Sequence, residues 1–117
     1  MINKCIFYSS LSGAENILIE RHRQINFECW ADSVNEIGDL SNFACCYAID
    51  PKGGDATNII KTLKPNGWQL KLSCNGNTED DIDGRIKDLI KAGACLAAEI
   101  DKLKEEQKSR LLKLVKL

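Results

Sequence analysis

The C-terminal third of the chain, residues 78–117, most constrains the fold, because large apolar side chains recur there with a heptad period. A helix with this spacing carries its apolar side chains along one face, which packs against another helix. The series is interrupted at Gln107 and Arg110 and then resumes. We call the whole series the heptad stripe: Ile82, Ile86, Leu89, Gly93, Leu96, Ile100, Leu103, Leu111 and Leu114. The sequence therefore predicts one long helix over residues 78–117.

This helix is expected to be longer than the domain that carries it. At ~1.5 Å per residue it spans roughly 54 Å, whereas a domain of this size has a radius of gyration of about 13 Å. An apolar overhang is best buried by a second subunit, so the sequence predicts a homo-oligomer. The predicted interface comprises Ile86, Leu89, Gly93, Leu96, Ile100, Leu103, Leu111 and Leu114. The alternative is a kink near residues 106–109 that folds the tail back.

Two further features of the long helix bear on its packing. Small residues surround Gly93, so a neighbouring helix can come close there; they are Ala94, Ala97 and Ala98. Acidic residues gather at the predicted start of the helix, near Asp81, and basic residues toward its end, near Lys113. The helix dipole favours this polarity, so the charge pattern needs no partner to explain it.

A first shorter helix is predicted over residues 13–29. Ser12 and Glu15 have the three-residue spacing of a capping box, in which each side chain satisfies a backbone N–H of the other residue. Residues spaced by four and three then form one face of the predicted helix: Leu18, His22, Ile25 and Cys29.

A second helix is predicted over residues 34–48, because Ser33 and Glu36 repeat the capping-box spacing. Its expected inner face consists of Ile37, Leu40, Ala44 and Tyr47, with Phe43 beside it. A third, short helix is predicted over residues 56–63, with Asp55 as N-cap.

The predicted fold is a single, mainly α domain over residues 1–117, in which two or three short helices pack on the long C-terminal helix. Residues 2–8 and 68–72 are the β-prone segments. They are expected either to pair as two short strands or to lie as extended segments on the helices.

Composition excludes several classes of protein. A net charge of −1 argues against a protein that grips nucleic-acid phosphates. No apolar run approaches the ~20 residues of a membrane span, and no secretory segment is recognised. We therefore predict a cytoplasmic protein without a membrane partner. With one histidine and irregular cysteine spacings, the six cysteines are expected to be free thiols and not a zinc site.

Two blocks of the sequence resemble a family of small uncharacterised phage and prophage proteins. The family's first run is approximately E-R-x-R-Q-I-x-x-E-G-W, followed after a turn by G-E-L-x-x-A-A-x-Y-A. Its counterpart here lies in residues 20–50, at Glu20, Arg21, Arg23, Gln24, Ile25, Glu28, Trp30, Gly38, Leu40, Ala44, Tyr47 and Ala48. The family's second run, R-D-L-V-K-A-G-A-L-x-x-A-E-I-x-R-L, resembles KDLIKAGACLAAEIDKL at residues 87–103.

The chain departs from the family pattern in the turn between these runs. The family's turn is rich in His and Asp, whereas this chain has ADSVNEI without His. Cys29 stands where the family has Gly, and Asp39 where it has Glu. A metal site in that turn is therefore not expected here. The resemblance implies a mainly helical phage or prophage accessory protein that acts in the cytoplasm of its host.

Two clusters are candidates for chemistry. Arg21, Arg23, Gln24 and Trp30 offer two guanidinium groups and an indole, which could bind a phosphate and stack a base. The alternative is that the arginines pair with acidic residues of another helix. Glu36 and Asp39 have an ExxD spacing that places both carboxylates on one helix face, and Glu99 is a second inward candidate.

We expect a non-catalytic phage-type accessory protein that binds a host defence protein or a small nucleotide and needs no cofactor. The alternative is a MazG-like all-α nucleotide pyrophosphohydrolase, in which Glu36, Asp39 and Glu99 would hold Mg²⁺. The sequence leaves catalysis itself open.

Overall fold

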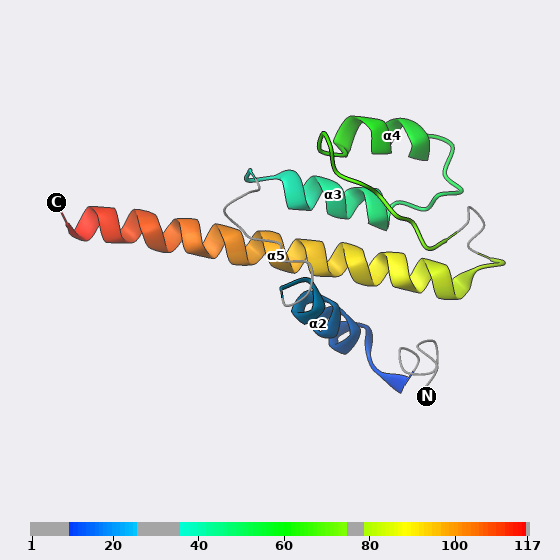
Figure 1. The fold of residues 1–117 in the computed structure, drawn as a ribbon, viewed down its shortest axis with the longest axis horizontal. Helices are drawn as coiled ribbons and strands as arrows, with labels where there is room; N and C mark the ends of the chain where they lie inside the picture. The colour runs from blue at the N-terminus through cyan, green and yellow to red at the C-terminus, as the bar shows by residue number, and fades with distance from the viewer. Residues whose placement is uncertain (1–9, 26–35, 75–78, 117) are drawn as a thin grey trace.

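The chain is built around α5 (Ile82–Val115), an unbroken helix of 34 residues (Figure 1). The computed structural model describes residues 10–25, 36–74 and 79–116. Three shorter helices precede α5: α2 (Gly13–Arg23), α3 (Asp39–Ala48) and α4 (Ala56–Leu63). No strand occurs in these described ranges. The predicted mainly α fold, with shorter helices on a long C-terminal helix, is confirmed.

The shorter helices attach to two different sides of α5. Figure 1 shows α3 and α4 along one side of α5 and α2 on the other. Both α2 and α3 contact α5, and α4 packs on α3. Gly93 marks the contact with α2, because a Cβ atom there would collide with the Ile17 side chain. The predicted close approach of a helix at this small-residue patch is confirmed.

The hydrophobic core lies between α3 and α5. It is formed by Phe43, Ala44, Tyr47, Ala92 and Cys95. The Phe43 ring meets the rings of Tyr47 and Trp68 edge to face, with centroids 5.1 and 5.0 Å away. This geometry brings the positive edge of one ring to the negative face of the other.

Residues 68–72 cover this core as an extended segment. Trp68, Leu70 and Leu72 pack against the core, and Gln69 and Lys71 between them are exposed. The segment has no strand pairing. The proposed partner, residues 2–8, lies outside the described residues.

Polar side chains of α5 hold α3 at both ends. Glu99 accepts a hydrogen bond from the N–H of Gly38, which is the N-cap of α3. Arg85 donates to the carbonyl oxygens of Tyr47 (3.0 Å) and Ala48 at the C-terminal end. The acidic group thus meets the positive end of the α3 dipole and the basic group the negative end. This arrangement fixes α3 antiparallel to α5.

A buried carboxylate holds the segment that leads into α5. Asp88 has no exposed surface, and its two oxygens accept the N–H groups of Ser73 (2.7 Å) and Cys74 (3.0 Å). Two turns earlier, the Asp81 side chain caps α5 by accepting the N–H of Gly84 at 2.9 Å. The first residue of the predicted long helix, Thr78, lies outside the described residues.

The predicted second helix begins later than expected. Gly38 has φ 98°, a left-handed conformation that favours glycine, so α3 starts at Asp39 and not at residue 34. The Asp39 carboxylate accepts the Glu36 N–H at 3.1 Å, which closes the turn ahead of the helix. Ile37 therefore precedes α3 and is 54% exposed, so its placement on the inner face was wrong. Ser33 lies outside the described residues.

The other predicted boundaries are closer to the structure. Both hydrogen bonds of the Ser12–Glu15 capping box are present at the start of α2: each side chain accepts the backbone N–H of the other residue. Regular α-helix ends at Arg23, and the residues beyond Ile25 are not described. The short helix α4 has the predicted bounds, with Asp55 at the N-cap position but without a side-chain hydrogen bond there.

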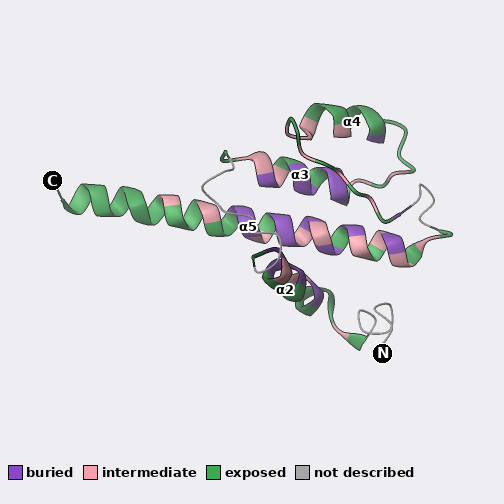
Figure 2. Cartoon of the chain, in the orientation of Figure 1, coloured by how far each residue is buried: buried purple, intermediate pink, exposed green. Residues whose placement is uncertain are grey.

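The molecule is elongated because α5 extends past the domain. The radius of gyration is 16.2 Å, against about 13 Å for a compact domain of this length. The final turns of α5 are exposed almost throughout, while its first two thirds alternate between buried and exposed residues (Figure 2). Since α5 is unbroken, the predicted overhang is present and the alternative kink near residues 106–109 is absent. No described helix is long and apolar enough to cross a membrane.

Candidate protein-binding surface

All the large apolar side chains of the heptad stripe are exposed. Their exposed fractions run from 42% at Ile86 to 68% at Leu114. The others between these limits are Ile82, Leu89, Leu96, Ile100, Leu103 and Leu111. Single exposed apolar residues are ordinary in soluble proteins, but a continuous series along one helix marks an interaction surface.

The large side chains of the stripe are exposed because α5 makes its internal contacts through other faces and, within the stripe, through Gly93 against Ile17. Toward α3 it presents a second series with the same four-three spacing: Asp88, Ala92, Cys95 and Glu99, all buried. Toward α2 it presents Ala94, Ala98 and the partner of Arg21, Asp101. Small side chains let the neighbouring helices approach closely, which the leucines and isoleucines of the stripe would prevent. The largest apolar residues of α5 are thereby left facing outward.

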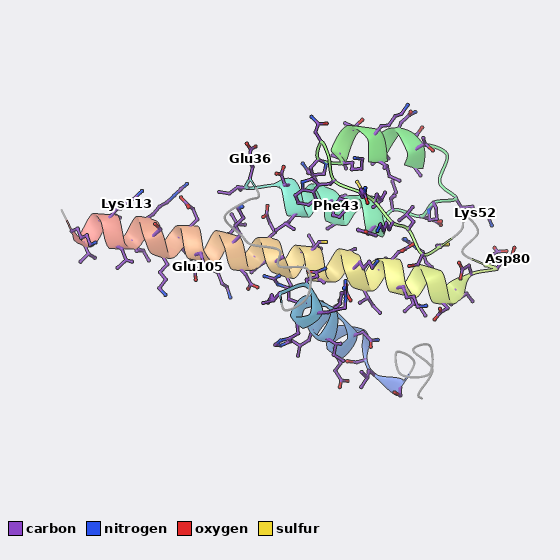
Figure 3. All side chains as sticks on the ribbon, viewed as in Figure 1. Glu36, Phe43, Lys52, Asp80, Glu105 and Lys113 are labelled. Atoms are coloured by element: carbon purple, nitrogen blue, oxygen red, sulfur yellow. The ribbon has the colours of Figure 1, made fainter. Side chains whose placement is uncertain are left out.

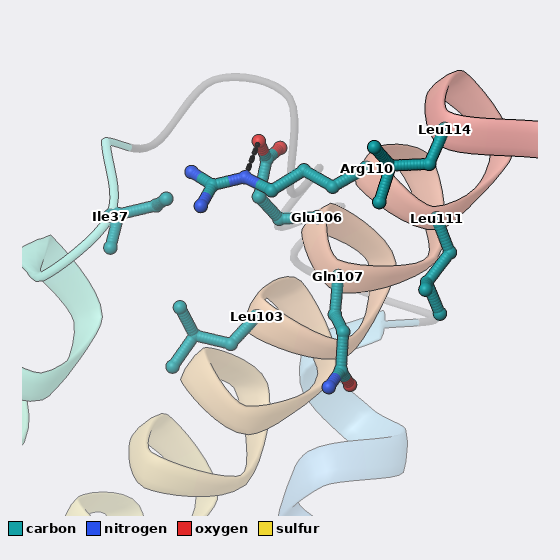
Figure 4. Close-up of a pocket in the computed structure, with 7 residues that line it drawn as sticks. All are labelled: Ile37, Leu103, Glu106, Gln107, Arg110, Leu111 and Leu114. Atoms are coloured by element: carbon teal, nitrogen blue, oxygen red, sulfur yellow. Dashed lines mark hydrogen bonds and ion pairs between the residues drawn. The ribbon is translucent and has the colours of Figure 1, made fainter. Parts of the chain in front are cut away.

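The stripe widens into a groove where α5 leaves the domain. Ile37, in the turn ahead of α3, lies across from Leu103 (Figure 4). Between them and the later turns of α5 is a groove of about 270 Å³, closed on its far side by Leu111 and Leu114. Its polar lining consists of Gln107 and an ion pair between Glu106 and Arg110 (3.2 Å). The groove thus joins an apolar floor to a charged rim, as protein interfaces do.

The overhang beyond this groove has no described element packed on it. Its side chains project into solvent on all sides, with Glu105 and Lys113 among them (Figure 3). Leu112 and Val115 are also exposed there; Leu112 lies off the line of the heptad stripe, and Val115 directly follows Leu114 where the apolar series resumes. The overhang therefore offers apolar surface from residue 103 to the end of α5.

The face of α2 that was expected to be apolar points away from α5. Leu18 is 59% and Ile25 49% exposed, and His22 is exposed too. The buried residues of this segment are polar instead: Asn16, Glu20, Arg21 and Gln24. The Ile17–Gly93 contact and the pairing of Arg21 with α5 set this rotation. The four-three spacing of the apolar residues did not reveal which side of α2 is buried.

The predicted ligand cluster is used inside the chain. Arg21 donates through Nε and Nη2 to the Asp101 carboxylate at 3.3 and 3.2 Å, which joins α2 to α5. Arg23 pairs with the buried carboxylate of Glu20 one turn earlier. Gln24 is buried, and Trp30 lies outside the described residues. Arg21 therefore pairs with a carboxylate of another helix, as the alternative interpretation expected, whereas Arg23 pairs with a carboxylate of its own helix.

The three carboxylates of the predicted metal site have separate structural roles. Glu99 reaches the turn that holds Glu36 and Asp39, but one of its oxygens accepts the Gly38 N–H. The other oxygen, Oε2, is buried and has no hydrogen-bond partner among the described residues. Asp39 caps the turn, and Glu36 is exposed. Over the described ranges, no three His, Cys, Asp or Glu side chains come together in a group that could hold a metal ion.

Sequence reasoning missed the two most informative polar residues of α5, Arg85 and Asp88. Both lie in the second four-three series or directly beside it. That series was hidden because it consists of small and polar residues, whereas the parallel series of large apolar residues is conspicuous. For Arg85 the available signal was its place three positions after Ile82 of the stripe, and for Asp88 it was the spacing of four to Ala92.

The described cysteines are free thiols, as predicted, and they differ in exposure. Cys45 is exposed, whereas Cys46, Cys74 and Cys95 are buried. Burial raises the pKa of the Cys46 thiol, and the adjacent Cys45 raises it further. Its Sγ donates to the carbonyl oxygen of Asn42 at 3.4 Å. A buried thiol with a raised pKa is a weak nucleophile, so Cys46 serves packing.

A comparison of this chain with models of known protein families, with curated proteins and with solved structures finds no match.

Proposed function

We propose that this protein is a non-catalytic accessory protein that acts by binding another protein through the heptad stripe of α5. The observation that carries the proposal is the continuous exposure of the large apolar residues along the stripe. Such a surface is unfavourable in water and gains stability when a partner covers it. Helix pairing and helix-in-groove recognition both use apolar anchors at this spacing.

A protein partner is favoured over a nucleotide. The two arginines that could have held a phosphate contact Asp101 and Glu20 instead. The groove beside Leu103 and Leu111 is lined mainly by apolar atoms, which suits an aliphatic or aromatic side chain. The resemblance to phage and prophage proteins points to a host protein, such as a component of a defence system, in the host cytoplasm.

No structural observation favours the hydrolase alternative. Asp39 and Glu99 act as helix and turn caps, which accounts for both carboxylates. Purified protein incubated with a panel of nucleoside triphosphates and Mg²⁺ or Mn²⁺ is expected to release no pyrophosphate. Release that disappears in Glu36→Ala, whose side chain is exposed and whose loss spares the fold, would establish the hydrolase and overturn the proposal.

The binding proposal is tested with two neighbouring leucines of the overhang. Leu111 lies in the heptad stripe and Leu112 lies off it, and they are 57% and 54% exposed. Tagged protein is incubated with host lysate, and the retained proteins are identified by mass spectrometry. We expect a specific set retained by native protein and by Leu112→Asp, and lost with Leu111→Asp. Identical sets from both variants would contradict a role for the stripe.

A further inference from the structure

We propose that one occupant of the heptad stripe is a second copy of this chain, with the two α5 helices antiparallel. This inference rests on the proposed function, because it names a partner for the same surface. Two observations carry it. The residues of the stripe face one another when two copies run antiparallel, and the charges at the two ends of α5 are opposite.

The spacing of the stripe makes it self-complementary in one particular register. When two antiparallel copies are centred on residue 98, Leu96 of each copy lies level with Ile100 of the other. Leu103 of one copy then lies level with Gly93 of the other, beside the Ile17 side chain that already covers this glycine. Each overhang runs beside the first turns of the other copy's α5, where Leu114 meets Ile82. The two stripes thus lie against each other from Ile82 to Leu114.

The groove at the end of the domain fits the same arrangement. In this register Leu89 of the second copy lies level with Gln107, inside the groove bounded by Ile37, Leu103 and Leu111. An aliphatic side chain entering there replaces water on apolar walls. The overhang, which the domain leaves uncovered, thereby gains a partner.

Charge selects the antiparallel orientation over the parallel one. The start of α5 and the residues just before it are acidic: Glu79, Asp80, Asp81 and Asp83. The last turns are basic: Lys108, Arg110, Lys113 and Lys116. Antiparallel helices bring each acidic end to within reach of the other copy's basic end, whereas parallel helices place four basic residues beside four more. Salt screens charges that lie more than a Debye length of about 8 Å apart, so opposite charges closer than this still attract each other.

The stoichiometry is measured first, by light scattering on purified full-length protein. We expect twice the chain mass of 13.0 kDa for native protein and for Leu112→Asp. Leu96→Asp, at the centre of the proposed interface, is expected to give the monomer mass with an unchanged helical circular dichroism spectrum. A monomer mass for native protein at the highest attainable concentration overturns this inference.

The orientation is measured by photo-crosslinking. A benzophenone amino acid replaces Leu114, and ¹⁵N-labelled and unlabelled chains are mixed so that crosslinks between copies are recognised by mass. The antiparallel dimer predicts crosslinks to the tryptic peptide 72–85 of the other copy. Crosslinks to the peptides around residue 114 would indicate a parallel dimer and overturn the inference.

These outcomes separate the inference from the proposed function. A native monomer that still retains host proteins in a Leu111-dependent manner refutes the second copy as partner and leaves the proposed function standing. A native monomer that retains nothing through the stripe refutes both.

Discussion

Asp88 is the residue on which the entry into α5 depends. It is buried without exposed surface, and it satisfies two backbone N–H groups from the segment that leads back to the helix. A buried carboxylate is unfavourable unless hydrogen bonds compensate it, and here both oxygens are used. The residue is therefore structural, although a buried aspartate invites a catalytic interpretation.

Replacing Asp88 by alanine is expected to lower the free energy of unfolding by about 2–4 kcal/mol, because the N–H groups of Ser73 and Cys74 lose their acceptors. Glu105→Ala, on the exposed overhang, is the control and should change it by less than about 0.5 kcal/mol. Urea denaturation followed by circular dichroism measures both. An Asp88→Ala protein as stable as the control would show that the carboxylate is dispensable.

Cys45 and Cys46 offer a comparison between adjacent thiols. Iodoacetamide at mildly alkaline pH is expected to alkylate Cys45 faster than Cys46 by at least about tenfold, because only a local opening exposes the buried thiol. Tandem mass spectrometry of the shared peptide measures the two rates. Equal rates would contradict the burial of Cys46.

The raised pKa of Cys46 also predicts a pH dependence of stability. The folded protein keeps this proton to a higher pH than the unfolded chain, whose thiol titrates near 9.0. The contribution of the Cys46 thiol to the free energy of unfolding is therefore complete below that pH. It decreases as pH rises above it, since the unfolded chain then binds fewer protons than the folded protein. Cys46→Ala should therefore lose less stability than native protein between neutral and strongly alkaline pH in urea denaturation. If native protein and Cys46→Ala lose the same stability over this pH range, the pKa of Cys46 is not raised by folding.

At the scale of elements, α5 positions α3 through polar contacts and α2 through close packing. The series Asp88, Ala92, Cys95 and Glu99 faces α3, and Gly93 admits Ile17 of α2. Heptad spacing predicted that α5 exists and how far it runs. It could not predict which face is internal, because two series with the same spacing lie side by side on the helix. Helix amphipathicity failed for α2 for a related reason, since the Ile17–Gly93 contact and the Arg21–Asp101 ion pair set its rotation.

Gly93→Ala is expected to destabilise the protein by about 1–3 kcal/mol, because the new methyl group collides with Ile17. In an open helix the same change would stabilise by about 1 kcal/mol. Gly13→Ala in α2, where nothing lies within 4 Å of the new atom, is the matched control and should be neutral or stabilising. If Gly93→Ala stabilised the protein as well, α2 would not pack there.

Removing the Arg85 contacts is expected to loosen the end of α3. In Arg85→Met the carbonyl oxygens of Tyr47 and Ala48 lose their donor, so the last turn should fray more often. Hydrogen exchange monitored by mass spectrometry should show faster exchange in residues 45–49 and little change in α2. Lys87→Met, on the exposed side of α5 next to Asp83, is the control. Uniform acceleration in both helices would indicate global destabilisation instead.

At the scale of the whole molecule, α5 is both scaffold and contact surface. Its first two thirds carry the domain, and its last turns extend beyond it with apolar residues exposed. Length and period alone predicted this overhang. The groove beside Ile37 was not predictable, because it depends on the left-handed turn at Gly38 that removes Ile37 from α3. In the proposed function, binding uses the large exposed residues of the stripe, whereas folding uses the other faces of α5 and Gly93.

Because those two sets of residues are separate, binding can be abolished without unfolding the domain. The most direct measurement is sedimentation equilibrium of three proteins: native, Leu111→Asp and Leu112→Asp. We predict a dimer for native protein and for Leu112→Asp, and a weakened dimer or monomer for Leu111→Asp, with the same helical content in all three. Three equal masses would contradict the assignment of the heptad stripe as the contact surface between copies.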